Sequence, residues 1–582
     1  MHERAILLRG DRVLSDDRRA AKLLEFFGVA PQKQSAFQFR FQAATSNQLP
    51  SRLFTAVETF ARILEQLESS NPRDGFEQQI HSIFLYSSGD PIALSKLIKQ
   101  LCGNDVRVRR GASSQTEWTI ADDPDGICGA MRGVRVYPTT ATLSSCDFFD
   151  ANQIPASRLI FADDKAAFLK LHWRGIPVFI SSVGLLDIDA ELGTRNFDVR
   201  DHFFQAVPFV SYVRWAFPTT AWNAPEAHAC LIIDDPLLKP KYGFICYREL
   251  LVLMKQLRFS ATIAFIPWNW NRSNPQVVRL FKENPESYSL CVHGCDHTRN
   301  EFNTSNRRRL RLLTSEAFKR MSLHEQRNGL SFDRIMVFPQ GAFSPDAVSE
   351  LKHAGFHAVV NTEVTSKPPG RRELRISDAL DVAVMSYSSF PIYSRRPPVH
   401  GIENFAFDLL VGKPCVIVIH HEFCRDGYSR LIEFVNQLNQ LRVPLVWRSI
   451  GEVVSRSYRG RQVSCELVEI EMYGSQLVME NRSDSKRSYF IRRREDQPES
   501  LEGLSAGTEQ LSWGVNGNYI EFRLTLQPYE TTLVTVHFKP SEFVAYDSQN
   551  IVSFTSTMLR RYLSEARDNY VTPVKARIGN LL

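Results

Sequence analysis

The sequence predicts a multidomain α/β protein with a central distorted (β/α)7-type barrel between an N-terminal Rossmann-like α/β domain and a C-terminal β-sandwich. The barrel is predicted because short apolar runs alternate with helical patterns between residues 228 and 458, and most of these runs end in polar residues. After residue 461, short segments with β periodicity separated by turn residues are typical of a sandwich. At 582 residues the chain is also too long for a single core.

Domain boundaries follow from these changes of pattern. We expect the Rossmann-like domain over residues 1–205, the barrel over 228–458 and the sandwich over 461–545. An aromatic and proline-rich stretch, 206–227, is interpreted as a linker packed on the barrel. The last segment, 546–582, is interpreted as a helical tail that packs back onto another domain.

The first domain is expected to alternate strands with helices, which indicates a parallel sheet. Its expected strands are 5–8, 81–86, 158–161 and 176–180, and its expected helices are 20–27, one ending at Leu101 and one ending near Trp173. The chain contains neither GxGxxG nor GxxxxGK[ST], so the nucleotide-phosphate fingerprints are absent and this domain reveals no function.

The barrel segment repeats one scheme of a strand followed by a helix. Its expected strands are 229–233, 261–266, 288–292, 335–338, 358–360, 414–419 and 444–447. In such barrels the active site lies at the carboxyl ends of the strands. Beyond it, the expected sandwich strands are 466–473, 476–479, 488–491, 519–524 and 531–538, followed by a helix over 554–567.

Composition excludes several classes of protein. The chain is 43% hydrophobic and 23% charged, and its net charge of +6 is too small and too spread out to favour nucleic acid or membrane binding. It has no apolar run of about 18 residues, so no membrane span is expected. Ten scattered cysteines favour reduced thiols, and the N-terminus lacks the apolar region of a signal peptide, so a cytoplasmic protein is expected. The oligomeric state stays open.

Two adjacent carboxylates, Asp234 and Asp235, close the apolar strand 229–233. Acidic groups at the end of a buried strand are costly unless something pairs with them, and a metal ion is a common partner. His293 and His297 directly follow another predicted strand and lie four residues apart, so both rings can bind one metal from the same side. Two imidazoles and one carboxylate with open positions form the ligand set of hydrolytic zinc sites.

These residues resemble the first two motifs of the polysaccharide deacetylases, the NodB-homology superfamily of carbohydrate esterase family 4. The matching stretches are Ile-Asp234-Asp235 and His293-Gly-Cys-Asp-His297, and the resemblance covers roughly residues 225–455. It implies that Asp234 is the general base and that Asp235, His293 and His297 bind one divalent metal ion. Zn²⁺ is the expected ion, with Co²⁺, Ni²⁺ or Mn²⁺ as alternatives.

Two further motifs are matched in part. Val337-Phe-Pro339-Gln-Gly341 resembles the third motif and implies substrate contacts by Pro339 and Gly341, but Val337 stands where the family has the arginine that orients the base. The apolar run that ends in His420 resembles the fifth motif. This implies that His420 is the general acid, with His421 as the alternative.

Three other side chains are weaker candidates for the site. Trp268 and Trp270 follow the strand 261–266 and could stack on a sugar ring, although packing at the rim of the barrel explains them equally well. Asp381 is a candidate for the fourth family motif, which is otherwise not found.

The leading hypothesis is a metal-dependent carbohydrate N-deacetylase that acts on an N-acetylated saccharide in bacterial polysaccharide or glycoconjugate metabolism. One alternative is a glycoside hydrolase on a related barrel. It ranks lower because glycosidases need two carboxylates about 5–10 Å apart across the bond, whereas Asp234 and Asp235 are neighbours on one strand. A second alternative is a catalytically degenerate saccharide-binding or scaffold protein, which Val337 favours.

Overall fold

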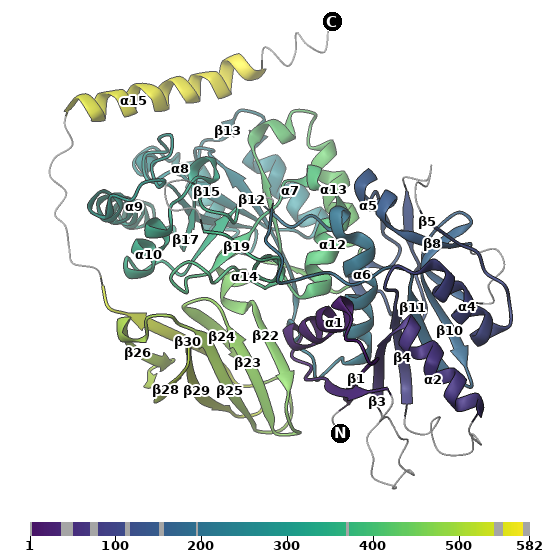
Figure 1. Ribbon diagram of the computed structural model, residues 1–582. Coiled ribbons are helices and arrows are strands. Elements are labelled where there is room, and N and C mark those ends of the chain that lie inside the picture. The colour runs from purple at the N-terminus through teal and green to yellow at the C-terminus, as the bar shows by residue number, and fades with distance from the viewer. Residues whose placement is uncertain are drawn as a thin grey trace, which may run out of the picture.

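The computed structural model describes residues 3–36, 51–69, 80–110, 117–150, 156–193, 196–367, 372–540 and 551–573. These residues form an N-terminal α/β domain, a central barrel, a β-sandwich and a C-terminal helix (Figure 1). The α/β domain and the sandwich lie against different parts of the barrel, and the C-terminal helix lies above the barrel on the side away from the sandwich (Figure 1).

The sheet of the N-terminal domain is parallel in one half and antiparallel in the other. The parallel strands are, in order, β2 (Gln32–Ser35), β1 (Arg4–Arg9), β3 (Ser51–Ala56), β4 (Ile80–Tyr86) and β11 (Ile176–Ser181). The antiparallel strands that follow are β10 (Lys165–Trp173), β9 (Ser157–Ala162), β6 (Trp118–Ile120) and β7 (Arg135–Val136), with β5 (Val108–Arg110) and β8 (Asp147–Asp150) beside them. The helices named in the sequence pattern are α1 (Ser15–Phe26) and α4 (Pro91–Cys102), and α2 (Val57–Ser69) lies between them in the chain. The expected Rossmann-like alternation therefore describes only the parallel half.

The predicted helix ending near Trp173 is wrong, because the segment forms strand β10. Tight turns join β10 to both of its neighbours, one at Asp163 (φ 46°) and one at Arg174-Gly175 (φ 49° and 81°). Two consecutive residues with positive φ form the hairpin turn that matches the twist of neighbouring strands. Ala166 favours a helix locally, but it is fully buried in the sheet.

The aromatic stretch 206–227, interpreted as a linker, is helical as far as Ala216. It forms the second half of α6 (Val199–Ala216), which packs on the N-terminal sheet. The ring of Tyr212 lies 5.4 Å from the ring of Phe54 and 5.0 Å from that of Phe84, centroid to centroid. The aromatic side chains that suggested a linker are thus the face of a buried helix.

The barrel sheet is parallel and nearly closed, as the sequence pattern predicts. Its strand order is β19 (Ile392–Ser394), β18 (Ala358–Asn361), β17 (Asp333–Val337), β16 (Tyr288–His293), β15 (Ala261–Phe265), β12 (Ala227–Asp234) and β20 (Cys415–Ile419), and β21 (Leu445–Trp447) also pairs with β12. Arg396, just after β19, donates its N–H to Val416 O (2.9 Å) and accepts from Val418 N (3.0 Å). These two bonds bring the first and last strands together.

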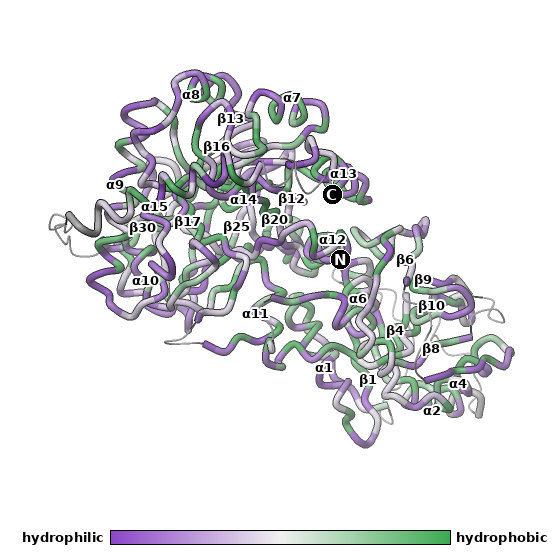
Figure 2. The backbone as a smooth tube through the Cα atoms, turned by 90° about the horizontal axis from the view of Figure 1, so that it is seen from above, coloured by the Kyte–Doolittle hydropathy of each residue, from purple (hydrophilic) through white to green (hydrophobic). Residues whose placement is uncertain are grey.

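Helices surround the barrel, and one closes its amino end. The outer helices are α7 (Tyr247–Leu257), α8 (Pro275–Lys282), α9 (Arg307–Asn328), α10 (Pro345–His353), α12 (Ile402–Val411) and α13 (Ser429–Asn439). Figure 2 shows hydrophilic and hydrophobic residues alternating along α8 and α10. At the amino end, α14 (Ile450–Arg456) places Ile450 and Val453 in the barrel interior, and Gly451 N donates to Asp333 at the start of β17 (3.0 Å). The carboxyl end is therefore the end that can hold a site.

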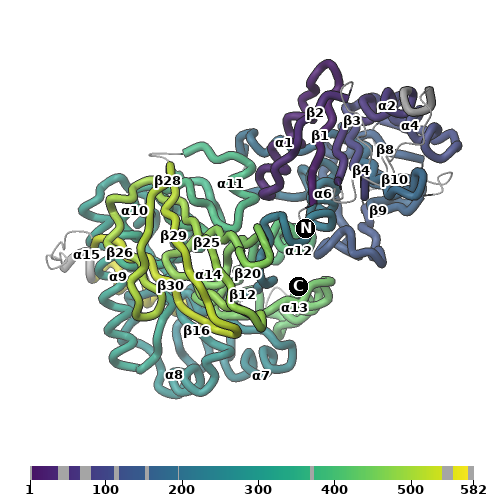
Figure 3. Tube along the Cα trace, turned by 90° about the horizontal axis from the view of Figure 1, so that it is seen from below, coloured from purple at the N-terminus to yellow at the C-terminus, as the bar shows by residue number. Residues whose placement is uncertain are grey.

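The sandwich consists of two sheets that share one core, as expected (Figure 3). The first sheet contains β22 (Tyr458–Gln462), β23 (Leu467–Met472), β25 (Arg487–Arg494), β29 (Tyr519–Leu526) and β28 (Trp513–Asn516). The second contains β24 (Gln476–Glu480), β30 (Thr531–Phe538), β26 (Leu501–Ala506) and β27 (Glu509–Gln510). The predicted boundary at residue 545 lies outside the described residues.

The C-terminal segment forms the helix α15 (Ile551–Ala566), which continues into a π-helical turn (Arg567–Val571). It packs on the barrel, in agreement with the expectation that the tail returns to another domain. Within the described part of the chain, no helix has the length and apolar character needed to cross a membrane.

Candidate metal centre and catalytic residues

Asp234 and Asp235 stand together at the carboxyl end of β12 but have different surroundings. Asp234 is the last residue of the strand and its side chain is 3% exposed, whereas that of Asp235 is 27% exposed. Asp235 adopts a positive φ of 79°, which is uncommon for a residue other than glycine. The chain thus turns sharply between the two carboxylates, and each meets its own partners.

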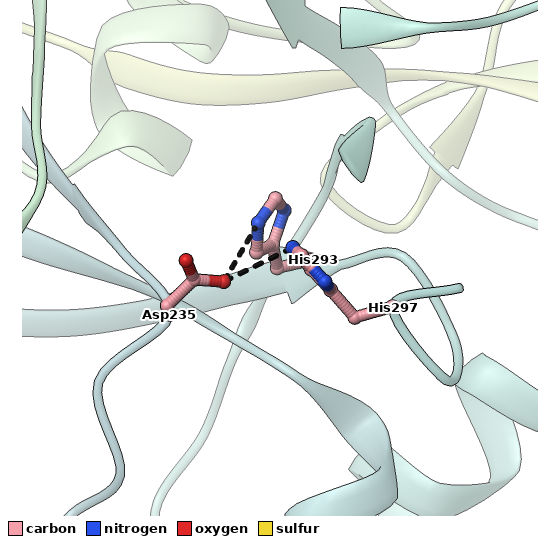
Figure 4. A group of neighbouring side chains, drawn as sticks. All are labelled: Asp235, His293 and His297. Atoms are coloured by element: carbon pink, nitrogen blue, oxygen red, sulfur yellow. Dashed lines mark ion pairs between the residues drawn. The ribbon is translucent and has the colours of Figure 1, made fainter. Parts of the chain in front are cut away.

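One carboxylate oxygen of Asp235 faces the rings of both His293 and His297 (Figure 4). Its Oδ1 atom is 3.4 Å from Nε2 of His293 and 3.1 Å from Nε2 of His297. The potential ligand atoms of these residues all lie within 4.8 Å of one another. Burial raises the pKa of Asp235, but the two imidazoles outweigh it and hold that pKa well below its usual range. The structure therefore brings together the three ligands named from the sequence.

The donor set fits a divalent metal ion. Oδ1 of Asp235 is buried and has no hydrogen-bond donor, so a cation between it and the imidazoles would satisfy it. Nδ1 of His293 lies 3.1 Å from the carbonyl oxygen of Val337. Because a carbonyl can only accept, Nδ1 carries the proton, and the lone pair of Nε2 faces Asp235. Val337 thus contributes to the site through its backbone.

A buried carboxylate, Glu301, holds the turn that carries His297. Its two oxygens accept the backbone N–H groups of residues 295–298 at 2.8 to 3.2 Å, and the hydroxyl of Thr298 at 3.2 Å. Gly294 begins this turn with a φ of 63°, and a Cβ atom there would collide with Glu301 and with Pro339. A glycine at 294 and an acid at 301 are therefore both needed for this shape of the turn.

Asp234 is paired with an arginine that the sequence analysis did not identify. Arg395, the residue after β19, donates from both terminal nitrogens to the two oxygens of Asp234, each at 2.7 Å. Both side chains are at most 4% exposed. Burial raises the pKa of Asp234, but the charge and hydrogen bonds of Arg395 outweigh it and the net shift is downward. Arg395 therefore gives Asp234, from another strand, a guanidinium partner that Val337 cannot provide.

The signal for Arg395 was weak in the sequence. Strand β19 has three residues, Ile392–Ser394, and was not recognised as a strand. The pair Arg395-Arg396 directly after it is a set of polar residues at a strand end, the same pattern that marked Asp234. Recognition of this short strand would have placed Arg395 at the carboxyl end of the barrel.

The two histidines after β20 point to different parts of the molecule. His420 is 56% exposed, and its Nε2 lies 3.9 Å from Oδ2 of Asp234. His421 is 4% exposed and lies 3.7 Å from Asp568 of the C-terminal segment, with the ring of Tyr242 beside it. Of the two, His420 is the one that faces Asp234, the residue next to the expected metal ligand Asp235.

The other residues named from the sequence lie at or behind the rim. Trp268, in the turn after β15, contacts the ring of Tyr562 from α15 (centroids 6.2 Å apart), and Trp270 is half-buried. Pro339 and Gly341 are buried, and Pro339 packs behind Gly294. Substrate contact by these four residues stays a prediction.

Asp381 does not belong to this site. It accepts a hydrogen bond from the hydroxyl of Tyr473 and lies 3.4 Å from Arg459, both of which follow the barrel in sequence. Its place is the contact between the barrel and the sandwich, away from the carboxyl ends of the barrel strands. The assignment of Asp381 to the fourth motif is therefore wrong.

Comparison with known proteins gives structural neighbours but no sequence relatives. No protein-family model matches the chain, and no curated protein matches it. Among solved structures, the carbohydrate deacetylase Agd3 is similar over 92% of this chain and 98% of that chain, with 11% identity and a TM-score of 0.44.

Two further solved structures are similar to a smaller share of the chain. A family 4 acetyl xylan esterase from Clostridium thermocellum, in complex with a cobalt ion, matches over 39% of this chain and 89% of that chain, with 11% identity and a TM-score of 0.25. A family 4 carbohydrate esterase from Streptomyces lividans, in complex with acetate, matches over 38% and 88%, with 14% identity and a TM-score of 0.23. These neighbours are carbohydrate deacetylases and esterases, the class that the sequence motifs resemble.

Proposed function

We propose that the chain is a metal-dependent hydrolase that removes the N-acetyl group from a sugar or saccharide in polysaccharide or glycoconjugate metabolism. The observation that carries this proposal is the convergence of Asp235, His293 and His297 beside an ionised Asp234 at the carboxyl end of the barrel. The saccharide as substrate comes from the resemblance of the motifs to the polysaccharide deacetylases.

The three ligands would hold one divalent ion, for which Zn²⁺ is expected first. When bound, such an ion supplies Lewis-acid polarisation of the amide carbonyl and of a water molecule. Other groups of the chain hold these ligands in place. The carbonyl of Val337 fixes the proton of His293 on Nδ1, and Glu301 fixes the turn that carries His297.

Asp234 is suited to act as the general base. Because Arg395 lowers its pKa, the carboxylate stays ionised at neutral pH and can take the proton from an attacking water. The bidentate contact also restricts the rotation of the carboxylate, since both oxygens are held at 2.7 Å. Asp234 adjoins the ligand Asp235 in sequence, so base and metal site act on one position.

His420 is suited to act as the general acid. Its ring is solvent-accessible and faces Asp234 at 3.9 Å, so the amide to be cleaved fits between the metal site and this histidine. Donation of a proton from His420 to the departing nitrogen, as the C–N bond breaks, yields acetate and the free amine of the sugar. The proton that Asp234 took from the water then passes to His420, 3.9 Å away, which returns both side chains to their starting forms.

Both alternative functions lose support from this geometry. A degenerate scaffold was favoured by Val337, but Arg395 provides the guanidinium that the third motif lacks. A glycoside hydrolase needs a second carboxylate across the scissile bond, whereas Asp235 faces two histidines and Asp234 faces Arg395.

The test is metal analysis of the purified protein together with acetate release from N-acetylated saccharides. We expect about one divalent ion per chain, lost together with acetate release in His293→Ala and in Asp235→Ala. His353→Ala, on the outer helix α10, is the matched control and should keep both properties. A correctly folded protein that binds no metal would overturn the proposal, and metal binding without acetate release from any such saccharide would favour the scaffold.

A further inference from the structure

The C-terminal helix α15 buries its polar side and exposes its apolar side. The buried stripe recurs at helical spacing, and its members are Thr557, Arg561, Glu565 and Asp568, all at most 9% exposed. The exposed large apolar residues of the helix and the turn after it are Met558, Leu559, Tyr562, Leu563, Tyr570 and Val571, all at least 38% exposed. A helix that belongs permanently to a core does the reverse.

The buried polar stripe is held by charged and polar groups of the barrel. Glu565 accepts hydrogen bonds from both Lys239 and Arg272. Asp568 accepts from the hydroxyl of Tyr242 at 2.8 Å. The next residue in the chain, Asn569, accepts the backbone N–H of Gly243, also at 2.8 Å. The C-terminal part of the helix and the turn that follows it are thus docked by specific polar contacts.

These contacts reach the loops at the carboxyl ends of four neighbouring barrel strands. The loop after β12 carries Lys239 and Tyr242, and the turn after β15 carries Trp268. The loop after β16 carries Asp296, whose backbone carbonyl accepts a hydrogen bond from Arg560 at 2.8 Å. The segment after β20 carries His421. Three of these strands, β12, β16 and β20, also present the metal ligands, the base and the acid. Figure 1 shows α15 extending across this end of the barrel.

The helix also carries a buried cation, Arg561. It is 7% exposed, and its Nε has no hydrogen-bond partner. Burial lowers the pKa of Arg561, and among the neighbouring charges that oppose this effect Asp235 is the strongest. Arg561 therefore interacts electrostatically with the carboxylate that would hold the metal ion.

We propose that α15 is an autoinhibitory cap, which covers the saccharide's path to the metal centre when docked and opens it when released. The inference rests on the proposed function for the identity of the ligand that is kept out. Trp268, the residue expected to stack on a sugar ring, is covered in the docked state by Tyr562, whose ring also lies 4.2 Å from the guanidinium of Arg272.

The cap is built for release, because its contacts depend on charge. Ion pairs near the surface are screened by salt. Lys239 is 37% exposed, whereas Glu565 and Arg272 are 11% and 13% exposed, so the pair of Glu565 with Lys239 is the more open to screening. The apolar residues of the helix already face solvent, so undocking exposes little additional apolar surface. A moderate change in ionic contacts can therefore shift the cap from docked to released.

The experiment measures two rates on the full-length protein loaded with Zn²⁺. The first is the removal of zinc by a chromogenic chelator, and the second is acetate release from an N-acetylated trisaccharide. Glu565→Gln keeps the shape of the side chain but removes the charge that Lys239 and Arg272 hold. We expect both rates to rise about three- to tenfold at low salt, and added salt should raise the wild-type rates toward those of the variant.

Glu480→Gln is the matched control, because it removes a carboxylate paired with Arg482 at 2.9 Å on the sandwich, far from the cap. Its rates should stay within about twofold of the wild type. Asp568→Asn is a second variant that loosens the cap at its other end. Unchanged rates in both cap variants, or slower acetate release in either, would overturn the proposal. Faster zinc removal with no acetate release from any variant would instead count against the deacetylase function and leave the cap standing.

Discussion

Replacement of Arg395 by leucine tests whether this arginine replaces the one that the third motif lacks. In the wild type, Asp234 and Arg395 are both nearly inaccessible to solvent and joined by two hydrogen bonds of 2.7 Å. Removing one partner of a buried ion pair leaves an uncompensated charge and costs about 3–5 kcal/mol of folding free energy. We therefore expect Arg395→Leu to lose about that much stability at pH 7.

The pH dependence of this loss has a definite sign. In the wild type the pKa of Asp234 is lowered, so its contribution to stability is present above the unfolded pKa of about 3.9 and disappears on acidification. Without Arg395, burial still raises the pKa of Asp234 and only the charges of His293 and His420 oppose it, so this pKa rises relative to the wild type. At low pH, Asp234 of the variant is protonated and no longer leaves an unpaired buried charge. The loss of folding free energy relative to the wild type should therefore be largest at pH 7 and should shrink toward pH 4.

Two assays follow these changes. Denaturant unfolding of the metal-free proteins at several pH values measures the difference in stability, and the pH profile of kcat/KM for acetate release measures the base. We expect the acid limb of that profile to move to higher pH in Arg395→Leu, because a larger share of Asp234 is protonated.

Arg396→Leu provides the control from the adjacent position. Arg396 is buried like Arg395 and pairs with Asp408 at 2.7 Å, so its loss should destabilise the protein by a similar mechanism. The partner of Arg396 is Asp408 and not Asp234. The acid limb of the kcat/KM profile should therefore lie at the same pH in Arg396→Leu as in the wild type. An unshifted acid limb in Arg395→Leu, or the same shift in both variants, would refute the positioning role of Arg395.

Two further predictions concern the turn of His297 and the general acid. Glu301→Gln leaves one acceptor oxygen for the N–H groups of residues 295–298, so zinc affinity, measured by competition with a chelator, should fall by about tenfold or more; an unchanged Kd would contradict this. His420→Gln should retain the metal ion but lose about 100-fold or more in kcat, because His420 faces Asp234. His421→Gln should retain most of its activity, because His421 faces Asp568. The opposite ranking of the two variants would make His421 the general acid.

Most of the barrel could be predicted because each of its strands has a recognisable pattern within its own few residues. A parallel strand buried on both faces reads as a continuous apolar run, and its carboxyl end reads as an abrupt change to polar residues, as at Ile233-Asp234 and Ile419-His420. Elements that are short or have an ambiguous secondary-structure propensity could not be predicted from such patterns. Strand β19 has only three residues, and strand β10 contains Ala166-Ala167, which favours a helix when its neighbours are not considered.

The metal ligands could also be predicted, since their pattern is local as well. His293 and His297 lie four residues apart on one turn, and Asp235 ends a strand that is two places away in the same sheet. The support for these ligands was less visible. Glu301 is an ordinary acid in the sequence, and it becomes the anchor of the turn only because the backbone folds around it.

By itself, the sequence determined the class of fold and predicted the metal ligands and the base Asp234, because spacing and strand ends mark such residues within a few positions. The partner of that base lies 161 residues away on another strand, and its contact depends on closure of the barrel. The cap is similarly non-local, since Glu565 and Lys239 lie 326 positions apart in the chain and meet only in the folded protein. Pairings at such separations are selected by the geometry of the whole fold, so only the tertiary structure decided them.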